Sequence, residues 1–310
     1  MRIMEKEFEI LAIDADFSLV HNVAKSFDKQ LYVPKVVQFA DGEYNVSCPD
    51  LPIRGKDFVV IHSTSEPVNA NLIKLLFLIG QLKECAAHRV HVIIPYFGYS
   101  RQTEGDNGQE HGNAKIVAKM IEAAGADSVA SVEIHEAMLG SFFSVPFCDI
   151  DVESVIADHV KKTFSDLESV CLVAPDGGAK DRVKAVVDIL QVPYVCFHKK
   201  RCGADKVEIV GMTGECSQKI AIIIDDIIGT AGTAIKVSDV LLANGALQVF
   251  GYFIHPVLAG HSAQLVQKSK FEKIYVSNSI DLAQDERVPT IEVFDISSAI
   301  SSYIHSLMRV

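Results

Sequence analysis

The segment Ile220–Thr233 holds residues whose types and order suit a phosphorylated sugar. Its apolar run ends in two carboxylates, Asp225 and Asp226, which could hold two vicinal hydroxyl groups or a hydrated Mg²⁺. A loop of small residues follows, and its backbone N–H groups and two hydroxyls could bind a phosphate. The loop residues are Gly229, Thr230, Ala231, Gly232 and Thr233.

A strand and a helix must position this loop. The run Ile222–Ile224 predicts a buried parallel strand, and the periodic apolar residues after Ala234 predict the helix that follows. The loop would then lie at the helix N-terminus, where the macrodipole favours an anion. An acidic pair at this place is more often only a helix cap and a turn, but the Thr-Ala-Gly-Thr continuation favours the phosphate site.

Short apolar runs alternate with helical patterns along nearly the whole chain, which is typical of parallel α/β units. Strands are expected at 8–13, 57–62, 90–94, 128–134, 170–174, 193–197, 220–225, 248–254, 273–276 and 290–293. Helices are expected at 17–29, 70–88, 112–124, 153–165, 180–190, 233–244, 261–269 and 296–308. A natural division between two similar halves lies near Ile150.

Five further segments decide between families that share such a loop. They are Phe-Ala-Asp-Gly-Glu at 39–43, Ile-Pro-Tyr-Phe-Gly-Tyr-Ser-Arg-Gln at 94–102, His135 with Gly-Ser-Phe-Phe at 140–143, Ala-Pro-Asp-Gly-Gly at 174–178, and His-Lys-Lys-Arg at 198–201. In this order and spacing they resemble the ribose-phosphate pyrophosphokinase family over nearly the whole chain. Phosphoribosyltransferases share only the loop after Asp226, so they resemble the chain less specifically.

The resemblance implies a fold as well as an activity. It implies an α/β protein of two similar phosphoribosyltransferase-type domains, each with a parallel sheet flanked by helices, and a site between them. Residues 1–150 would form the N-terminal domain, joined by the terminal helix within 296–310, and residues 151–295 would form the C-terminal domain. It also implies a homo-oligomer, either a dimer or a hexamer.

The activity that the resemblance implies is transfer of the pyrophosphoryl group of Mg-ATP to the C1 hydroxyl of ribose 5-phosphate. The products would be phosphoribosyl pyrophosphate and AMP, and Mg²⁺ would be the cofactor. ATP would be bound by Phe39, Asp41, Glu43, Arg101, Gln102 and His135. Ribose 5-phosphate would be bound by Asp176, Asp225, Asp226, Gly229, Thr230, Ala231, Gly232 and Thr233. Metal contacts would fall on His135 and Asp176, and Lys199 and Arg201 would meet the triphosphate from a closing flap.

Each of these residues also has an ordinary interpretation. An isolated histidine such as His135 is usually structural or exposed, and Pro-Asp-Gly around Asp176 is a common turn. Arg101 could be a surface arginine, and the cations at 199–201 could form a solvated patch. The match of whole segments to the family favours the functional roles.

The chain departs from the family pattern at three places. Gly229 stands where an aspartate is common, and Thr103 and Glu104 stand where an acidic and then a basic residue are usual. Residues 109–113 replace a segment that usually includes Arg and Pro. Two alternatives to the synthetase therefore stay open: a non-catalytic, synthetase-like regulatory subunit and a phosphoribosyltransferase.

Composition limits the remaining functions. The 310 residues carry a formal net charge of −11, which argues against an extended nucleic-acid surface. The N-terminal residues lack the apolar core of a signal peptide, and no run is long enough to span a membrane, so the protein is expected to be cytoplasmic. The seven cysteines contain no Cys-x-x-Cys pair and are expected to be reduced.

Overall fold

The computed structural model describes residues 7–104, 112–201 and 207–309. The chain divides into two compact units, Met1–Asp151 together with Ile296–Val310, and Val152–Asp295. Each unit holds a mainly parallel sheet with helices packed against it. The predicted α/β class is therefore confirmed.

The first unit is built on a six-stranded parallel sheet in the order β2-β1-β5-β6-β7-β8. Its strands are β1 (Phe8–Ala12), β2 (Leu31–Tyr32), β5 (Asp57–Ile61), β6 (Arg89–Ile94), β7 (Ser128–Val132) and β8 (Phe147–Ile150). A separate antiparallel hairpin joins β3 (Lys35–Gln38) and β4 (Tyr44–Ser47). The helices are α1 (Ser18–Ser26), α2 (Val68–Glu84), α3 (Asn113–Ala124), α4 (Met138–Ser141) and α9 (Ser297–Met308).

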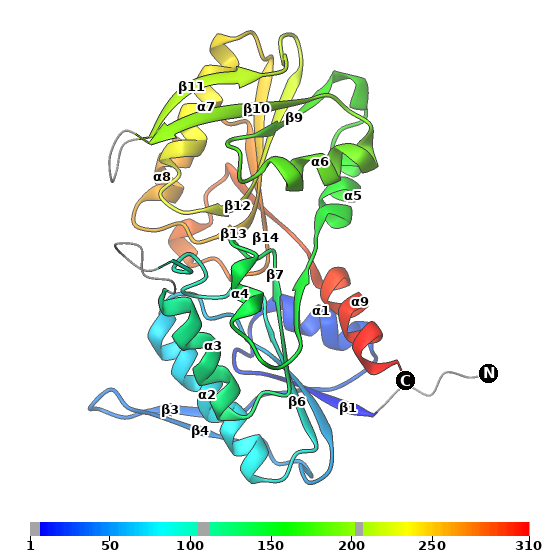
Figure 1. Ribbon diagram of the computed structural model, residues 1–310, viewed down its shortest axis with the longest axis vertical. Helices are drawn as coiled ribbons and strands as arrows, with labels where there is room; N and C mark the ends of the chain where they lie inside the picture. The colour runs from blue at the N-terminus through cyan, green and yellow to red at the C-terminus, as the bar shows by residue number, and fades with distance from the viewer. Residues whose placement is uncertain (1–6, 105–111, 202–206, 310) are drawn as a thin grey trace, which may run out of the picture. The chain divides into compact units, whose positions relative to one another are not determined.

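Apolar side chains of this sheet and its helices form the core of the first unit. Phe58 and Val60 of β5 belong to one buried cluster with residues of α2 and α3, among them Leu75 and Ile121. The C-terminal helix α9, red in Figure 1, lies beside α1, which is blue. The Ser26 and Ser301 hydroxyls join the two helices at 2.7 Å. The end of the chain thus completes the first unit.

The second unit has a seven-stranded sheet in the order β11-β10-β9-β12-β13-β14-β15, in which only the β10–β11 pair is antiparallel. Its strands are β9 (Val170–Ala174), β10 (Tyr194–Arg201), β11 (Val207–Thr213), β12 (Ile220–Ile228), β13 (Gln248–Pro256), β14 (Lys273–Ser277) and β15 (Ile291–Phe294). The helices are α5 (Glu153–Thr163), α6 (Lys180–Leu190), α7 (Gly232–Ala243) and α8 (Ser262–Gln267), with short 3₁₀ turns at Leu167–Ser169 and Gln284–Glu286.

Burial explains why β12 is the central strand of this unit. Ala221 and Ile223 lie in one apolar cluster with Val237 and Leu241 of α7. Because both faces of a parallel sheet are covered by helices, its inner strands are continuous apolar runs rather than alternating ones. The apolar run Ile222–Ile224, from which the strand was predicted, lies in β12.

Among the described strands, β7, β10, β12 and β13 end at least two residues away from their predicted ends. The strand expected at 128–134 ends at Val132, because Glu133 has φ of 43° and leaves the extended region. The strand expected at 220–225 continues to Ile228, so that the acidic pair lies inside it. Five strands (β2, β3, β4, β8 and β11) and helix α4 were not predicted. Among the described helices, none combines the length and the apolar character that crossing a membrane requires.

Candidate functional site

Three carboxylates gather at one edge of the second sheet. Asp176 follows β9, and Asp225 and Asp226 lie near the end of β12. The two strands pair in parallel, with Val173 opposite Ile223, so their carboxyl ends meet at the same edge. Open α/β sheets bind ligands at this edge.

Burial and mutual repulsion disfavour the ionised form of Asp225 in the acidic cluster. Burial raises the pKa of Asp225 well above its usual range, and the neighbouring charges of Asp226 and Asp176 raise it further. The Arg182 guanidinium opposes this shift from 4.0 Å, measured from Nη1 to the Asp225 Oδ1. The Asp225 side chain keeps 20% of its surface exposed, so a ligand can still reach it. A cation or a set of hydroxyl donors would relieve the repulsion among the carboxylates.

Asp176 is held in place by the start of α6. Its Oδ1 accepts the N–H groups of Gly178 at 3.0 Å and of Ala179 at 3.2 Å. These contacts explain the Pro-Asp-Gly turn of the sequence and fix the Asp176 carboxylate directly before α6.

The small-residue loop lies where an anion site was expected. Helix α7 begins at Gly232, directly after Ala231, which has φ of 61° and makes no side-chain cap. Thr230 and Thr233 are exposed on either side of this start. The first N–H groups of a helix have no partner within the helix, so the loop presents donors and a positive dipole end to an anion.

Lys199 and Arg201 lie on β10, which extends beyond its predicted end at 197. This strand pairs with β11 in antiparallel register, with Lys199 opposite Ile209 and Arg201 opposite Val207. The strands β10 and β11, which flank the segment that the resemblance assigns to a closing flap, therefore form a β-hairpin. Its tip, residues 202–206, lies outside the described residues.

In the first unit, the segment that carries Phe39, Asp41 and Glu43 is the turn between β3 and β4. Phe39 donates its N–H to the Glu43 carbonyl at 2.8 Å, and Glu43 donates its N–H to Asp41 Oδ1 at 3.1 Å. Gly42, between them, has φ of 94°, which suits glycine. The turn holds these side chains at an exposed tip, where the Phe39 ring is 51% exposed.

One buried and one exposed hydrogen bond position the segment after β6. The Thr64 hydroxyl accepts the Gly98 N–H at 2.7 Å, and a Cβ on Gly98 would lie 2.4 Å from the Thr64 carbonyl oxygen. Further along, the Gln102 Oε1 accepts the Asn113 amide at 2.7 Å, which ties the segment to α3. Arg101 and Gln102 are exposed at the end of this supported loop.

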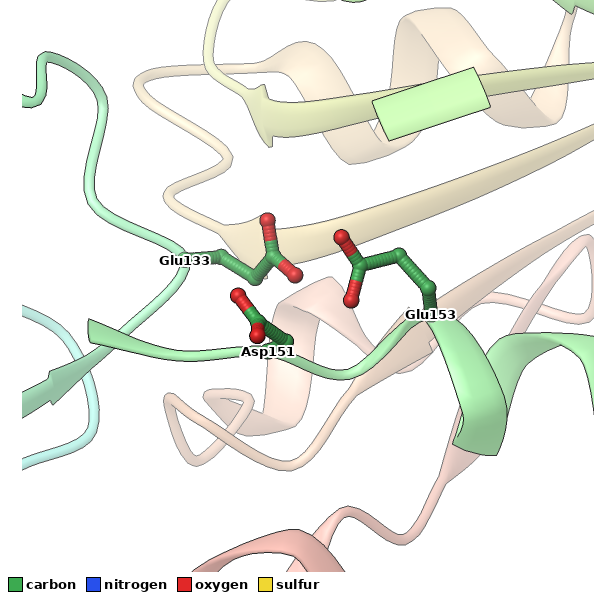
Figure 2. Close-up of side chains that lie close together, drawn as sticks. All are labelled: Glu133, Asp151 and Glu153. Atoms are coloured by element: carbon green, nitrogen blue, oxygen red, sulfur yellow. The ribbon is translucent and has the colours of Figure 1, made fainter. Parts of the chain in front are cut away.

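His135 follows β7 and is exposed, as its position after the strand suggested. The bend before it is fixed by Asp149, whose Oδ1 accepts the Ile134 N–H at 3.0 Å. Figure 2 shows Glu133 beside Asp151, and these two carboxylates offer oxygen atoms within 4.8 Å of each other. The third labelled side chain, Glu153, comes two residues later, at the start of α5. Glu133 is buried whereas Asp151 is exposed, and the closeness of their carboxylates does not by itself define a metal site.

Comparison with known proteins assigns the chain to a family. A family model described as the N-terminal domain of ribose phosphate pyrophosphokinase matches residues 8–125, and one described as the phosphoribosyl synthetase-associated domain matches residues 154–309. Ribose-phosphate pyrophosphokinase of Bacillus caldolyticus is 32% identical over 97% of this chain and 94% of its own length. The chain belongs to the ribose-phosphate pyrophosphokinase family.

Two further relatives agree with this assignment. Ribose-phosphate pyrophosphokinase 1 of Streptococcus pyogenes is 34% identical over 96% of this chain and 93% of its own length. The crystal structure of phosphoribosylpyrophosphate synthetase from Mycobacterium smegmatis matches with a TM-score of 0.88 and 29% identity, over 97% of this chain and 99% of that one. The family predicted from the sequence is confirmed.

Two contributors to this pyrophosphokinase-family site were missed by sequence reasoning. Arg182 lies in the first turn of α6, and a cation there opposes the helix dipole, which is the signal that could have drawn attention to it. Thr64 lies three residues after the end of β5 and supports the segment that carries Arg101 and Gln102. Of the segment that departs from the family at 109–113, residues 109–111 lie outside the described residues.

Proposed function

We propose that this pyrophosphokinase transfers the pyrophosphoryl group of Mg-ATP to the C1 hydroxyl of ribose 5-phosphate. The C1 oxygen attacks the β-phosphorus, the bond from the β-phosphorus to the oxygen bridging it to the α-phosphorus breaks, and AMP leaves. The product is phosphoribosyl pyrophosphate. The observation that carries the proposal is the acidic cluster next to the uncapped start of α7, together with the family assignment.

The second unit supplies the sugar-phosphate half. The loop from Gly229 to Thr233 binds the 5-phosphate through N–H groups and hydroxyls at the start of α7. Asp225 and Asp226 accept hydrogen bonds from the ribose hydroxyls, and Arg182 limits the repulsion between them. These contacts orient the C1 hydroxyl for attack.

Magnesium fits the donor set of this edge. Carboxylate oxygens are its preferred protein ligands. Burial raises the pKa of Asp225 and the nearby Asp226 and Asp176 raise it further, and a dication would offset the charge of these carboxylates. Asp176 is proposed as a direct contact, and His135 of the first unit as a contact to the metal or the phosphates. Bound Mg²⁺ would neutralise charge on the phosphate oxygens during transfer.

The first unit supplies the nucleotide half. Phe39 stacks on adenine, and Asp41 and Glu43 accept hydrogen bonds from the donor groups of the base. Arg101 and Gln102 bind the nucleotide.

The second unit supplies two cations to the nucleotide. Lys199 and Arg201 approach the triphosphate from the β10–β11 hairpin and stabilise the charge that develops in transfer.

A homo-oligomer is part of the proposal. The Phe39 turn is exposed at the tip of a hairpin, which suits a contact with the nucleotide of a neighbouring subunit. The number of subunits follows from measurement of the mass in solution.

The test is a product analysis with purified protein, Mg-ATP and ribose 5-phosphate. We expect AMP and phosphoribosyl pyrophosphate in equal amounts, with no product when Mg²⁺ is removed by a chelator. ADP as the main nucleotide product would reject pyrophosphoryl transfer. ATP binding without turnover of any pentose phosphate would identify the regulatory-subunit alternative, and consumption of phosphoribosyl pyrophosphate with a nucleobase would identify a transferase.

A further inference from the structure

Two cysteines of the first unit lie side by side although they are far apart in the sequence. Cys48 follows β4, and Cys85 caps the end of α2. Burial raises the pKa of the Cys48 thiol, and the nearby Cys85 thiol raises it further. Neither sulfur belongs to a disulfide in this structure.

Independent contacts hold the two positions together. Gln81 of α2 accepts the Cys48 N–H at 3.1 Å and donates its own amide to the Val46 carbonyl. The Cys85 N–H in turn bonds the Gln81 carbonyl at 2.9 Å, one helical turn further along α2. Residues four apart lie on the same face of a helix, so the face that clamps the main chain around Cys48 also carries Cys85.

The two thiols differ in their exposure to solvent. Cys85 is exposed and can meet a small oxidant, whereas Cys48 is half-buried. Burial, with the neighbouring Cys85, raises the pKa of Cys48 to about 11, which makes Cys48 the less readily oxidised of the two thiols. This order is typical of an attacked cysteine and its resolving partner.

We propose that Cys48 and Cys85 form an oxidation site that closes to an intramolecular disulfide when the protein meets a peroxide. The Cys85 sulfur attacks hydrogen peroxide, becomes a sulfenic acid, and one peroxide oxygen leaves as water. The Cys48 sulfur then attacks the Cys85 sulfur, the sulfenic oxygen leaves as a second water, and the S–S bond forms. The two thiols lose two electrons and two protons, which reduce the peroxide to water.

The bond would tie the end of β4 to the end of α2. Strand β4 is one arm of the hairpin whose turn carries Phe39, Asp41 and Glu43. We therefore expect slower amide exchange in β3 and β4 after oxidation. An effect on the KM for ATP rests on the proposed function, whereas formation of the bond does not.

The experiment is peptide mapping of the full-length protein after peroxide treatment and alkylation, without reduction. We expect one cross-linked pair of peptides holding Cys48 and Cys85, lighter by two hydrogen atoms than the separate peptides and split by reductant. The variants Cys48→Ser and Cys85→Ser should each lose it. The matched control, Cys148→Ser, should keep it, because the groups that raise the pKa of Cys148 are burial, Asp149 and Asp151 rather than a second thiol.

Three results would overturn the proposal. They are a Cys85 that only reaches the sulfinic acid while Cys48 stays free, a link between two molecules, and a cross-link that survives in the Cys85→Ser variant. Circular dichroism of each variant confirms that it is folded, and the exposed position of Cys85 makes its serine variant the safer of the two.

Discussion

The candidate ligand-binding residues of the two units differ in burial and in charge. In the second unit, the site is built from half-buried or buried carboxylates beside a helix start that no side chain caps. Burial, and then repulsion from Asp226 and Asp176, raise the pKa of Asp225. In the first unit, the candidate residues Phe39, Arg101 and His135 are exposed on turns. The supporting contacts there include a buried hydrogen bond from the Gly98 N–H to the Thr64 hydroxyl.

This difference has a physical consequence. The second unit stores unfavourable charge that ligands and cations relieve, so its substitutions should alter turnover and stability together. The first unit contributes exposed groups that gain contacts only when the nucleotide arrives, so its substitutions should alter the KM for ATP and leave stability nearly unchanged. The following predictions test that contrast.

The largest effect is expected for Asp225→Asn combined with Asp226→Asn. The double variant keeps the shape of the site but removes both charges from the ribose and metal contacts, so kcat/KM should fall roughly 10³-fold or more. Steady-state kinetics measures this, with circular dichroism to confirm folding. Asp239→Asn is the control, because its carboxylate lies exposed on α7 and pairs with Lys270 at 2.9 Å. Normal kinetics for ribose 5-phosphate in the double variant would reduce the acidic pair to a structural feature.

The next effect concerns Lys199→Ala and Arg201→Ala on the β10–β11 hairpin. Contacts made only as charge develops appear in kcat rather than in KM, so each variant should lose roughly 10² to 10³ in kcat. Lys200→Ala should be mild, because side chains alternate between the two faces of a strand. Equal and small losses at all three positions in single-turnover measurements would remove the hairpin from the mechanism.

A smaller effect is expected for Phe39→Ala. Stacking of an aromatic ring on a base is worth about 1–3 kcal/mol, so the KM for ATP should rise roughly 5- to 150-fold while the Tm stays unchanged. Phe77→Ala is a matched control, because that ring on α2 is 43% exposed, against 51% for Phe39. If the two variants behave alike, the hairpin turn does not bind adenine.

Glu104 offers a gain rather than a loss. Its exposed carboxylate stands where the family usually has a cation, so Glu104→Lys should lower the KM for ATP roughly two- to fivefold, as expected for an exposed charge. The KM for ribose 5-phosphate should not move, and the gain should shrink at high salt. A KM for ATP that is the same at low and high salt would place Glu104 away from the nucleotide.

The smallest effect is on stability. The folded-state pKa of Asp225 is raised, so its contribution to stability is present at acidic pH and is lost as the pH rises through that pKa. Asp225→Asn alone should therefore raise the Tm of the ligand-free protein at neutral pH, by roughly 2–4 °C for about 1 kcal/mol. The gain should disappear at acidic pH. A lower Tm at neutral pH would contradict the account of stored repulsion.

Much of the fold was predictable because its inner strands are buried on both faces. Runs such as Ile222–Ile224 stay apolar throughout, and their helices carry periodic apolar residues. The hairpin of β3 and β4 escaped prediction because its residues mix exposed and half-buried positions without a clear period. Strand β11 depends on pairing with β10, which local sequence does not specify.

Asp176 was grouped with Asp225 through the resemblance to the family, and the parallel pairing of β9 with β12 brings the strand ends next to these residues to one sheet edge. The position of Arg182 near that edge and the raised pKa of Asp225 depend on tertiary packing, so no spacing rule could give them.

The central claim is that the pyrophosphoryl group moves as a unit, and ATP with a radioactive phosphorus at the β-position tests it most directly. The label should leave the nucleotide and appear in the sugar product, while label placed at the α-position should remain in AMP. The same transfer should be absent in the Asp225→Asn, Asp226→Asn double variant. Retention of the β-label in ADP, with only the γ-phosphate reaching the sugar, would contradict the account.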